Sequence, residues 1–316
     1  MTLALVTGGA GFIGSHIVRA LLAEGWRVRV LDDFSSGRRE NLAGLAGARL
    51  EVQEGDLRDP QALRAALRGV AVVFHEAAFV SVPASMEDPL TCHDINDTGT
   101  ARLLESARQA GVARVVLASS AAVYGNSTAF PLREDQPPRP LSPYAATKAA
   151  NELFARLYTT AFDLPVTALR YFNVYGPRQR PDSPYAAAIP IFARRMLAGQ
   201  PPIVFGDGGQ RRDFVFVGDV AQANLRAAES EAAAGEAINI CTGREVTLLE
   251  LIATLQELIP GAPAPVFAPP RPGDIYRSVG DPTKAAQLLG FRPQTPLREG
   301  LAEVVTWMQK TGPLSK

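Results

Sequence analysis

The sequence predicts an α/β protein with a Rossmann-like, doubly wound parallel sheet and a smaller C-terminal α/β lobe. Short, continuous apolar runs such as residues 2–7 suit strands that are buried on both faces of a parallel sheet. These runs alternate with helical patterns through the first half of the chain, which is typical of a sheet covered by helices on both faces. The third observation is a glycine-rich turn that directly follows the first run and opens a helix.

Length, composition and charge bound the class of protein. With 316 residues the chain can form one large domain or two. Apolar residues make up 47% and charged residues 20%, as in globular proteins. The 32 basic and 32 acidic residues cancel, so the charge favours neither nucleic acid nor membrane as a partner. Two cysteines and the lack of a signal-peptide pattern indicate the cytoplasm. The scattered His16, His75 and His93 indicate no metal site.

The first strand, glycine turn and helix predict a dinucleotide site. Gly8, Gly9, Gly11 and Gly14 permit a tight turn, and they let backbone N–H groups at the helix start approach a pyrophosphate. Asp32 ends the next apolar run, about 20 residues later, where an acid binds an adenosine ribose. Because an acid would repel a 2′-phosphate, the sequence favours NAD over NADP. Arg38 and Arg39 argue the other way, but they lie beyond the strand end.

The strand ends provide the main argument for a site. We expect further strands at residues 26–31, 49–53, 71–75, 114–118 and 166–170, and helices at 60–68, 94–110 and after Ser142-Pro143. A loop is expected around Val82-Pro83. Ligands bind beyond the carboxyl ends of parallel strands. Candidate residues lie at these ends: Gly11, Asp32, Asp56, Ala77, Ser120 and Tyr171.

A tyrosine and a lysine form the candidate catalytic pair. Tyr144 and Lys148 are four residues apart in an Ala-rich helical stretch, so they share one helix face. A phenol has a pKa of about 10, and a nearby ammonium lowers it. The pair is therefore suited to proton transfer near neutral pH.

Beyond Arg170 the pattern becomes irregular and indicates a second unit. Helices are expected at about residues 189–198, 217–229, 248–258 and 297–309. We assign residues 1–172 to an NAD-binding Rossmann domain and residues 173–316 mainly to a substrate-binding lobe. Segments near residues 214–241 are expected to rejoin the first domain.

Motifs in family order run through nearly the whole chain. They are TGGAGFIG at residues 7–14, GDLRD at 55–59, HEAA at 75–78, Asn96 at an expected helix start, SSAAVYG at 119–125, YAATK at 144–148, RYFNVYGP at 170–177, RRDFVFVGDVA at 211–221 and RPGD at 271–274. With these motifs the chain resembles an extended short-chain dehydrogenase/reductase of the NAD-dependent epimerase/dehydratase family, in its nucleotide-sugar 4-epimerase branch.

The resemblance implies a chemistry for the pair. Tyr144, held as phenolate by Lys148 and the nicotinamide charge, would take a proton from a sugar hydroxyl while a hydride leaves for NAD. Ser120 would bind the same oxygen. In the epimerases the 4-keto sugar turns over and takes the hydride back, so UDP-glucose and UDP-galactose interconvert without net oxidation.

Four alternatives to an epimerase stay open, one of them a reductase that releases its product and consumes free NADH or NADPH in stoichiometric amounts. A 4,6-dehydratase or a decarboxylase would need acidic residues after Ser120, where this chain has Ala121 and Ala122. The fourth alternative is a catalytically inactive NAD-binding protein, since fold alone does not establish activity. Such proteins usually lack the tyrosine or the lysine, whereas this chain keeps both.

The resemblance also assigns binding residues. For NAD these are Gly8, Gly11, Phe12, Ile13, Gly14, Asp32, Asp33, Ser36, Gly37, Asp56, Leu57, Ala77, Ala78, Asn96, Ala118, Tyr144, Lys148 and Tyr171, with Phe172 beside the nicotinamide. For a UDP- or dTDP-sugar they are Ser120, Tyr144, Asn173, Val204, Phe205, Arg212, Arg271, Asp274 and Ser278. The small Ser278 implies tolerance of N-acetylhexosamines. A homodimer through paired helices is expected.

Overall fold

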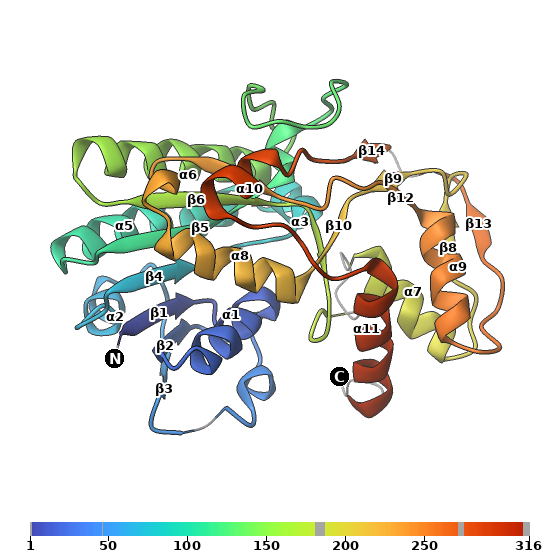
Figure 1. Ribbon diagram of the computed structural model, residues 1–316, viewed down its shortest axis with the longest axis horizontal. Helices are drawn as coiled ribbons and strands as arrows, with labels where there is room; N and C mark the ends of the chain where they lie inside the picture. The colour runs from blue at the N-terminus through green and yellow to red at the C-terminus, as the bar shows by residue number, and fades with distance from the viewer. Residues whose placement is uncertain (1, 46, 181–186, 271–274, 312–316) are drawn as a thin grey trace.

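The computed structural model describes residues 2–45, 47–180, 187–270 and 275–311, and a seven-stranded parallel sheet organises them. The strand order is β11-β6-β5-β4-β1-β2-β3 (Figure 1). Because β1 pairs with both β2 and β4, the order reverses there, and a ligand crevice forms at such a reversal. The strands are β1 (Leu3–Thr7), β2 (Arg27–Asp32), β3 (Leu50–Glu54), β4 (Val72–His75), β5 (Arg114–Ser120), β6 (Val166–Tyr171) and β11 (Ala237–Ile240).

Helices cover both faces of this sheet. Alternate residues of one strand enter different cores: Leu5 packs with α2, α5 and α6, and Val6 packs with α1, α8 and α10. Burial on both faces explains why the strands read as unbroken apolar runs. The covering helices are α1 (Phe12–Ala23), α2 (Pro60–Ala66), α5 (Gly99–Gln109), α6 (Pro143–Ala161), α8 (Val217–Glu229) and α10 (Thr283–Leu289). The predicted doubly wound architecture is confirmed.

Much of the C-terminal half of the chain forms a lobe beside the carboxyl ends of the strands (Figure 1). Its core is a third apolar cluster around Phe192, Leu251 and Leu301. The lobe contains α7 (Ala188–Leu197), α9 (Leu248–Leu258), α11 (Leu297–Thr311) and the small sheets of β8 (Ile203–Phe205) with β13 (Val266–Ala268), of β7 (Asn173–Tyr175) with β10 (Phe214–Phe216), and of β9 (Arg211–Arg212) with β12 (Val246–Thr247) and β14 (Arg277–Ser278). β11 returns to the large sheet beside β6, whereas β10 pairs with β7. The domain boundary itself stays a prediction.

Two local expectations are wrong. The segment around Val82-Pro83 is helical, not a loop: α3 (Val82–Glu87) begins at Ser81, whose hydroxyl accepts a hydrogen bond from Ala84 N, and proline suits the first helical turn. Asn96 does not start a helix. It lies in a π-helical segment (Asp94–Thr98) between α4 (Pro89–His93) and α5, so the helix runs on from Pro89.

A buried ion pair joins α6 to β6 behind the strand ends. Arg170 donates two hydrogen bonds to Glu152, of 2.8 and 2.7 Å, and a third to Tyr124 Oη at 2.7 Å. Both side chains are almost fully buried. Ser119 Oγ donates to the same Glu152 carboxylate at 2.5 Å. The pair is fully hydrogen-bonded, as buried charges must be, and it fixes α6 relative to β5 and β6.

Within the described ranges, no helix has the length and apolar character needed to cross a membrane. In the same part of the chain, no group of three histidine, cysteine, aspartate or glutamate side chains is placed to hold a metal ion.

Candidate functional site

The glycine turn between β1 and α1 packs so closely on its neighbours that Gly8 and Gly14 have no room for a side chain. Gly8 has φ +65°, and a Cβ added there would lie 2.7 Å from Ala77 N. A Cβ on Gly14 would lie 2.3 Å from Gly8 O, so the turn packs tightly on the helix. α1 starts after Gly11 without a side-chain cap or an acidic residue in its first turn. Phe12 and Ile13 form that turn. The free N–H groups at the helix start suit a pyrophosphate.

Besides the expected ribose contact, Asp32 makes hydrogen bonds within the protein. Its carboxylate is buried and accepts hydrogen bonds from Ala10 N and Phe34 N, both at 2.9 Å. It therefore ties the end of β2 to the glycine turn. Each carboxylate oxygen keeps acceptor capacity for a ribose hydroxyl. Gly37 lies directly against it, since an added Cβ would be 2.7 Å from Asp32 Oδ1. Asp33 and Ser36 are exposed nearby.

Asp56 is held as a carboxylate at the end of β3. Arg58 donates to both of its oxygens, with a shortest contact of 2.6 Å, and also donates to Asp94 at 2.8 Å. The hydrogen bonds from Arg58 lower the pKa of Asp56. Leu57 is buried in the core beneath α5, so only its backbone is available to a cofactor.

The loop after β4 is held by Asn96. Its side chain accepts from Phe79 N at 2.8 Å and donates to Phe79 O at 3.1 Å and to Thr147 Oγ1 at 3.0 Å. Asn96 was predicted to contact the cofactor. The structure shows its side chain occupied in joining this loop to α6. Ala77 and Ala78 lie in the same loop, half-buried next to the glycine turn.

Ser120, Tyr144 and Lys148 come together at the ends of β5 and α6. Ser142 caps α6 by accepting from Ala145 N at 3.2 Å, which sets the start of the helix. Lys148 Nζ donates to Ala118 O at 2.8 Å and lies 5.8 Å from the centroid of the Tyr144 ring. A hydrogen bond links Tyr144 to Ser120. The predicted trio therefore shares one site.

Burial controls the proton affinities of the catalytic pair. Burial raises the pKa of Tyr144 to about 12, although the hydrogen bond with Ser120 opposes the rise. Burial also lowers the pKa of Lys148 to about 8. Both shifts disfavour the charged forms. In the chain without a cofactor, proximity to Lys148 therefore does not make Tyr144 a phenolate.

A carboxylate that the sequence analysis left without a role also lies at this site. Glu76 directly follows β4, and Tyr171 Oη donates to its Oε1 at 2.8 Å. Asn224 of α8 donates to the same Tyr171 hydroxyl at 2.8 Å. The only sequence signal for Glu76 was an acidic residue at a strand end inside the HEAA motif.

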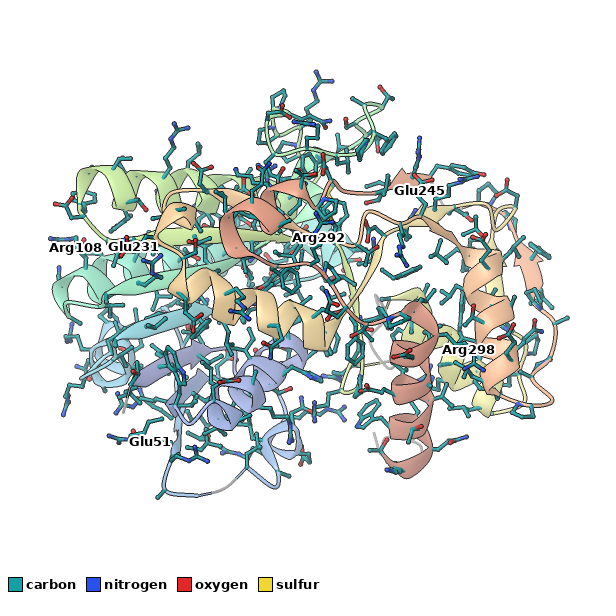
Figure 2. The ribbon with its side chains drawn as sticks, viewed as in Figure 1. Glu51, Arg108, Glu231, Glu245, Arg292 and Arg298 are labelled. Atoms are coloured by element: carbon teal, nitrogen blue, oxygen red, sulfur yellow. The ribbon has the colours of Figure 1, made fainter. Side chains whose placement is uncertain are left out.

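The lobe contributes a cluster of arginines. Ser278 and Arg212 face each other across the β9–β14 pair, and Arg212 Nη1 donates to Tyr276 O at 3.3 Å. Glu245, labelled in Figure 2, pairs with Arg211 at 3.1 Å and with Arg277. The sequence analysis missed Arg211, Glu245 and Arg277, because no local motif marks an ion pair formed between distant segments.

The remaining predicted substrate residues have mixed outcomes. Asn173 is half-buried and donates to Asp213 O at 3.1 Å. The expected packing of Val204 on a base is not possible for its side chain, which is fully buried in the lobe core. Phe205, its neighbour, remains half-exposed. Arg271 and Asp274 lie outside the described residues.

The glycine turn gives the first testable prediction. We expect Gly8→Ala to reduce the NAD that copurifies with the protein at least tenfold, because the new methyl group would displace the loop at Ala77. A left-handed residue other than glycine also costs about 1–2 kcal/mol of folding free energy. Gly25→Ala is the matched control: Gly25 has φ +83°, and Arg49 at 4.0 Å is its nearest neighbour. Equal NAD loss in both variants would contradict the prediction.

Comparisons with known proteins agree with this site. Residues 4–241 match the model of the NAD dependent epimerase/dehydratase family. A UDP-glucose 4-epimerase from Mycolicibacterium smegmatis is 43% identical over 313 residues, covering 96% of this chain and 98% of that protein. A UDP-N-acetyl-alpha-D-glucosaminuronate decarboxylase from Bacillus cytotoxicus is 33% identical over 318 residues, with 97% of each chain covered.

A solved structure is similar over the same length. The UDP-N-acetylglucosamine 4-epimerase from Methanobrevibacter ruminantium M1, in complex with UDP-N-acetylmuramic acid, superimposes with a TM-score of 0.95 at 38% identity. The superposition covers 98% of this chain and 99% of that one. The resemblance inferred from the motifs is confirmed. The chain belongs to the NAD-dependent epimerase/dehydratase family and is an enzyme with NAD as its cofactor.

Proposed function

We propose that the protein interconverts the C4 epimers of a nucleotide sugar, UDP-glucose and UDP-galactose, through a 4-keto intermediate. The observation that carries the proposal is the meeting of Ser120, Tyr144 and Lys148 at the carboxyl ends of the strands. A tyrosine, a lysine and a hydroxyl at one site suit removal of a proton from a sugar hydroxyl. NAD, when bound, accepts the hydride from the sugar carbon and later returns it.

The residues divide the work by position. Ser120 Oγ, which accepts from Ala122 N at 3.1 Å, can donate its own proton to the sugar oxygen and orient it. Tyr144 removes the proton from that oxygen. Lys148, fixed to Ala118 O, supplies positive charge to the phenolate up to about pH 8, where its own pKa lies. The positive charge of a bound nicotinamide would add to that of Lys148. Together the two charges would lower the pKa of Tyr144, which burial raises.

Turning the keto sugar over requires that the nucleotide end stay bound. Arg212, beside Ser278 on β9, is the side chain that we assign to the diphosphate, because guanidinium groups bind phosphate oxygens in pairs. The ion pairs of Glu245 with Arg211 and Arg277 brace the same strands. The nucleotide is therefore held on the lobe while the sugar turns in front of Tyr144.

The two alanines after Ser120 disfavour elimination and decarboxylation. Ala121 and Ala122 open the short 3-10 helix (Ala121–Tyr124) next to the catalytic hydroxyl. Neither can transfer a proton, so the positions where a dehydratase or a decarboxylase would carry acidic groups are inert. Retention of Tyr144 and Lys148 disfavours the inactive NAD-binding alternative in the same way.

Tyr144→Phe tests the catalytic assignment. We expect it to lower kcat for UDP-galactose to UDP-glucose conversion by about 10³-fold or more, with NAD content unchanged, because only the proton acceptor is removed. Tyr158→Phe on the same helix is the control and should keep wild-type activity. The assay is a coupled measurement of UDP-glucose together with the absorbance of bound cofactor. If Tyr144→Phe kept more than a tenth of the activity, the assignment would fail.

Ser278 is proposed to admit N-acetylated sugars. Its side chain is small and half-buried on β14 opposite Arg212. We expect Ser278→Tyr to abolish turnover of UDP-N-acetylglucosamine while sparing UDP-galactose, because the phenol fills the space of the acetyl group. Ser278→Ala should leave both activities in place. Parallel loss of both sugars in Ser278→Tyr would show that the residue does not select between them.

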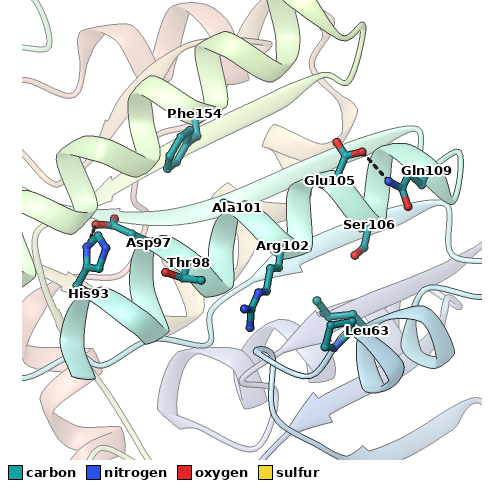
Figure 3. Close-up of a pocket in the computed structure, with 11 residues that line it drawn as sticks. Leu63, His93, Asp97, Thr98, Ala101, Arg102, Glu105, Ser106, Gln109 and Phe154 are labelled. Carbon is teal, nitrogen blue, oxygen red and sulfur yellow. Dashed lines mark hydrogen bonds and ion pairs between the residues drawn. The ribbon is translucent and has the colours of Figure 1, made fainter. Parts of the chain in front are cut away.

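A homodimer is proposed through the outer face of α5 and α6. An open hollow of about 540 Å³ lies there, between α2, α5 and α6, lined by residues that include Leu63, Ala101 and Phe154 (Figure 3). None of its lining residues is a predicted site residue. On α6, Leu153 and Leu157 are 71% and 46% exposed, one turn apart. A second copy that packs there would cover this apolar face.

Light scattering after size-exclusion chromatography tests the dimer. Replacing both Leu153 and Leu157 with glutamate should convert a dimer of wild-type protein into a monomer, because buried carboxylates would oppose association. Val52→Glu, at the exposed edge of the sheet, is the matched control and should stay dimeric. A monomeric wild-type protein would refute the proposal.

A further inference from the structure

Glu76 lies beside the proposed catalytic pair, although the proposed proton transfer does not use it. Its backbone N donates to Thr7 O at 3.1 Å, just before the glycine turn. A Cβ added to Gly8 would lie 2.9 Å from the carbonyl carbon of Glu76. The residue therefore sits against the turn that carries the dinucleotide, at the point where the strand order reverses.

The contacts of Glu76 fix one carboxylate oxygen. Asn224 Nδ2 donates to Val220 O at 2.9 Å and to Tyr171 Oη at 2.8 Å, and the first bond sets the orientation of the amide. The Tyr171 hydroxyl has two acceptors within reach, Glu76 Oε1 at 2.8 Å and Asn224 Oδ1 at 3.1 Å. Because the Asn224 amide already directs a proton at this hydroxyl, the shorter bond to Glu76 is the one that we assign to the hydroxyl proton. Glu76 accepts this hydrogen bond, as an ionised carboxylate does.

The charged groups that face Glu76 are those of the catalytic pair. Lys148 of α6 is the cation within electrostatic reach, and Tyr144 and Tyr171 are the other titratable groups. Burial raises the pKa of Glu76 to about 7, although the Tyr171 hydrogen bond and Lys148 oppose the rise. At pH 8 the side chain is mainly ionised. Its negative charge opposes a phenolate at Tyr144, so it does not assist proton removal.

The charge of Glu76 has a different target. For Tyr144 to act beside the hydride acceptor, the nicotinamide must lie in the space that Tyr144 and Ser120 face, within electrostatic reach of Glu76. The oxidised ring is a cation and the reduced ring is neutral. We propose that Glu76 sets the redox preference of the bound cofactor: its carboxylate stabilises the oxidised form relative to the reduced form. An enzyme that returns its hydride in every turnover gains a resting state that is ready to oxidise the sugar.

A redox titration of the NAD-loaded enzyme at pH 8, without sugar, tests the inference. Bound cofactor is reduced stepwise by dithionite through a viologen mediator and read by its absorbance near 340 nm. We expect Glu76→Gln, which keeps the shape and the acceptor for Tyr171, to make reduction about tenfold more favourable, a midpoint about 30 mV more positive. Tyr171→Phe removes the hydrogen bonds of the hydroxyl to Glu76 and Asn224 but keeps the charge of Glu76, so it should shift the midpoint much less.

Glu257→Gln is the matched control for loss of one negative charge. Glu257 is exposed on α9, 3.6 Å from Arg298 (labelled in Figure 2), and its variant should keep the wild-type midpoint. If Glu76→Gln fails to fold, Glu76→Leu compared with Tyr171→Phe separates charge from hydrogen bonding. An unchanged midpoint in the Glu76 variants, or an equal shift in Tyr171→Phe, overturns the inference.

The inference rests on the proposed position of the nicotinamide beside Tyr144, but its test uses no nucleotide sugar. Failure of the epimerase assay with a shifted midpoint would refute the substrate proposal and support the role of Glu76. Normal epimerase activity of the wild-type protein with unshifted midpoints in the variants would support the substrate proposal and refute the role of Glu76.

Discussion

The hydrogen bond from Lys148 Nζ to Ala118 O joins the helix that carries Tyr144 to the strand that carries Ser120. It satisfies a buried ammonium and at the same time sets the distance between two elements that meet at the site. It acts close to the reacting groups, since Ala118 lies two residues before Ser120 and Lys148 one helical turn after Tyr144. Behind it, the fully hydrogen-bonded pair of Arg170 and Glu152 fixes the same helix to β6. The two contacts give α6 a single position over the sheet.

Burial governs the titratable groups of the candidate site. Burial lowers the pKa of the Lys148 ammonium and raises the pKa of the Tyr144 phenol, so it disfavours the charged form of both groups. Glu76 adds an acid whose pKa burial raises to about 7. A cationic nicotinamide is then the group that changes the balance: it favours both the phenolate and the carboxylate. The proposed binding of a cationic nicotinamide beside Tyr144 would therefore complement the charges of the protein.

The lobe works by a different principle from the sheet. Around β9, β12 and β14 the ion pairs of Glu245 with Arg211 and Arg277 are partly exposed and join short strands. Such pairs contribute little to stability, but they set the direction of the guanidinium groups. In the proposed function, the sheet carries the reacting groups and the lobe carries the residues assigned to the nucleotide. This division suits a reaction in which the sugar must move and its carrier must not.

The sequence by itself determined what depends on local pattern. Unbroken apolar runs, the glycine turn and the i, i+4 spacing of Tyr144 and Lys148 are properties of neighbouring residues, so the sheet, the dinucleotide turn and the catalytic pair could all be predicted. The helix α3 is an exception, since a loop was expected around Val82-Pro83. Its N-cap Ser81, with a proline in the first turn, is a local signal that could have predicted it.

Only the tertiary structure decided which distant groups meet. The partners of Asn96, the burial of Val204 and the position of Glu76 against Tyr171 and Asn224 depend on contacts between segments far apart in the chain. Proton affinities follow the same rule, because they depend on burial. The sequence was enough to name Ser120, Tyr144 and Lys148. Packing decided that Tyr144 is buried, and burial raises the pKa of its phenol, so that the phenol stays neutral in the chain without a cofactor.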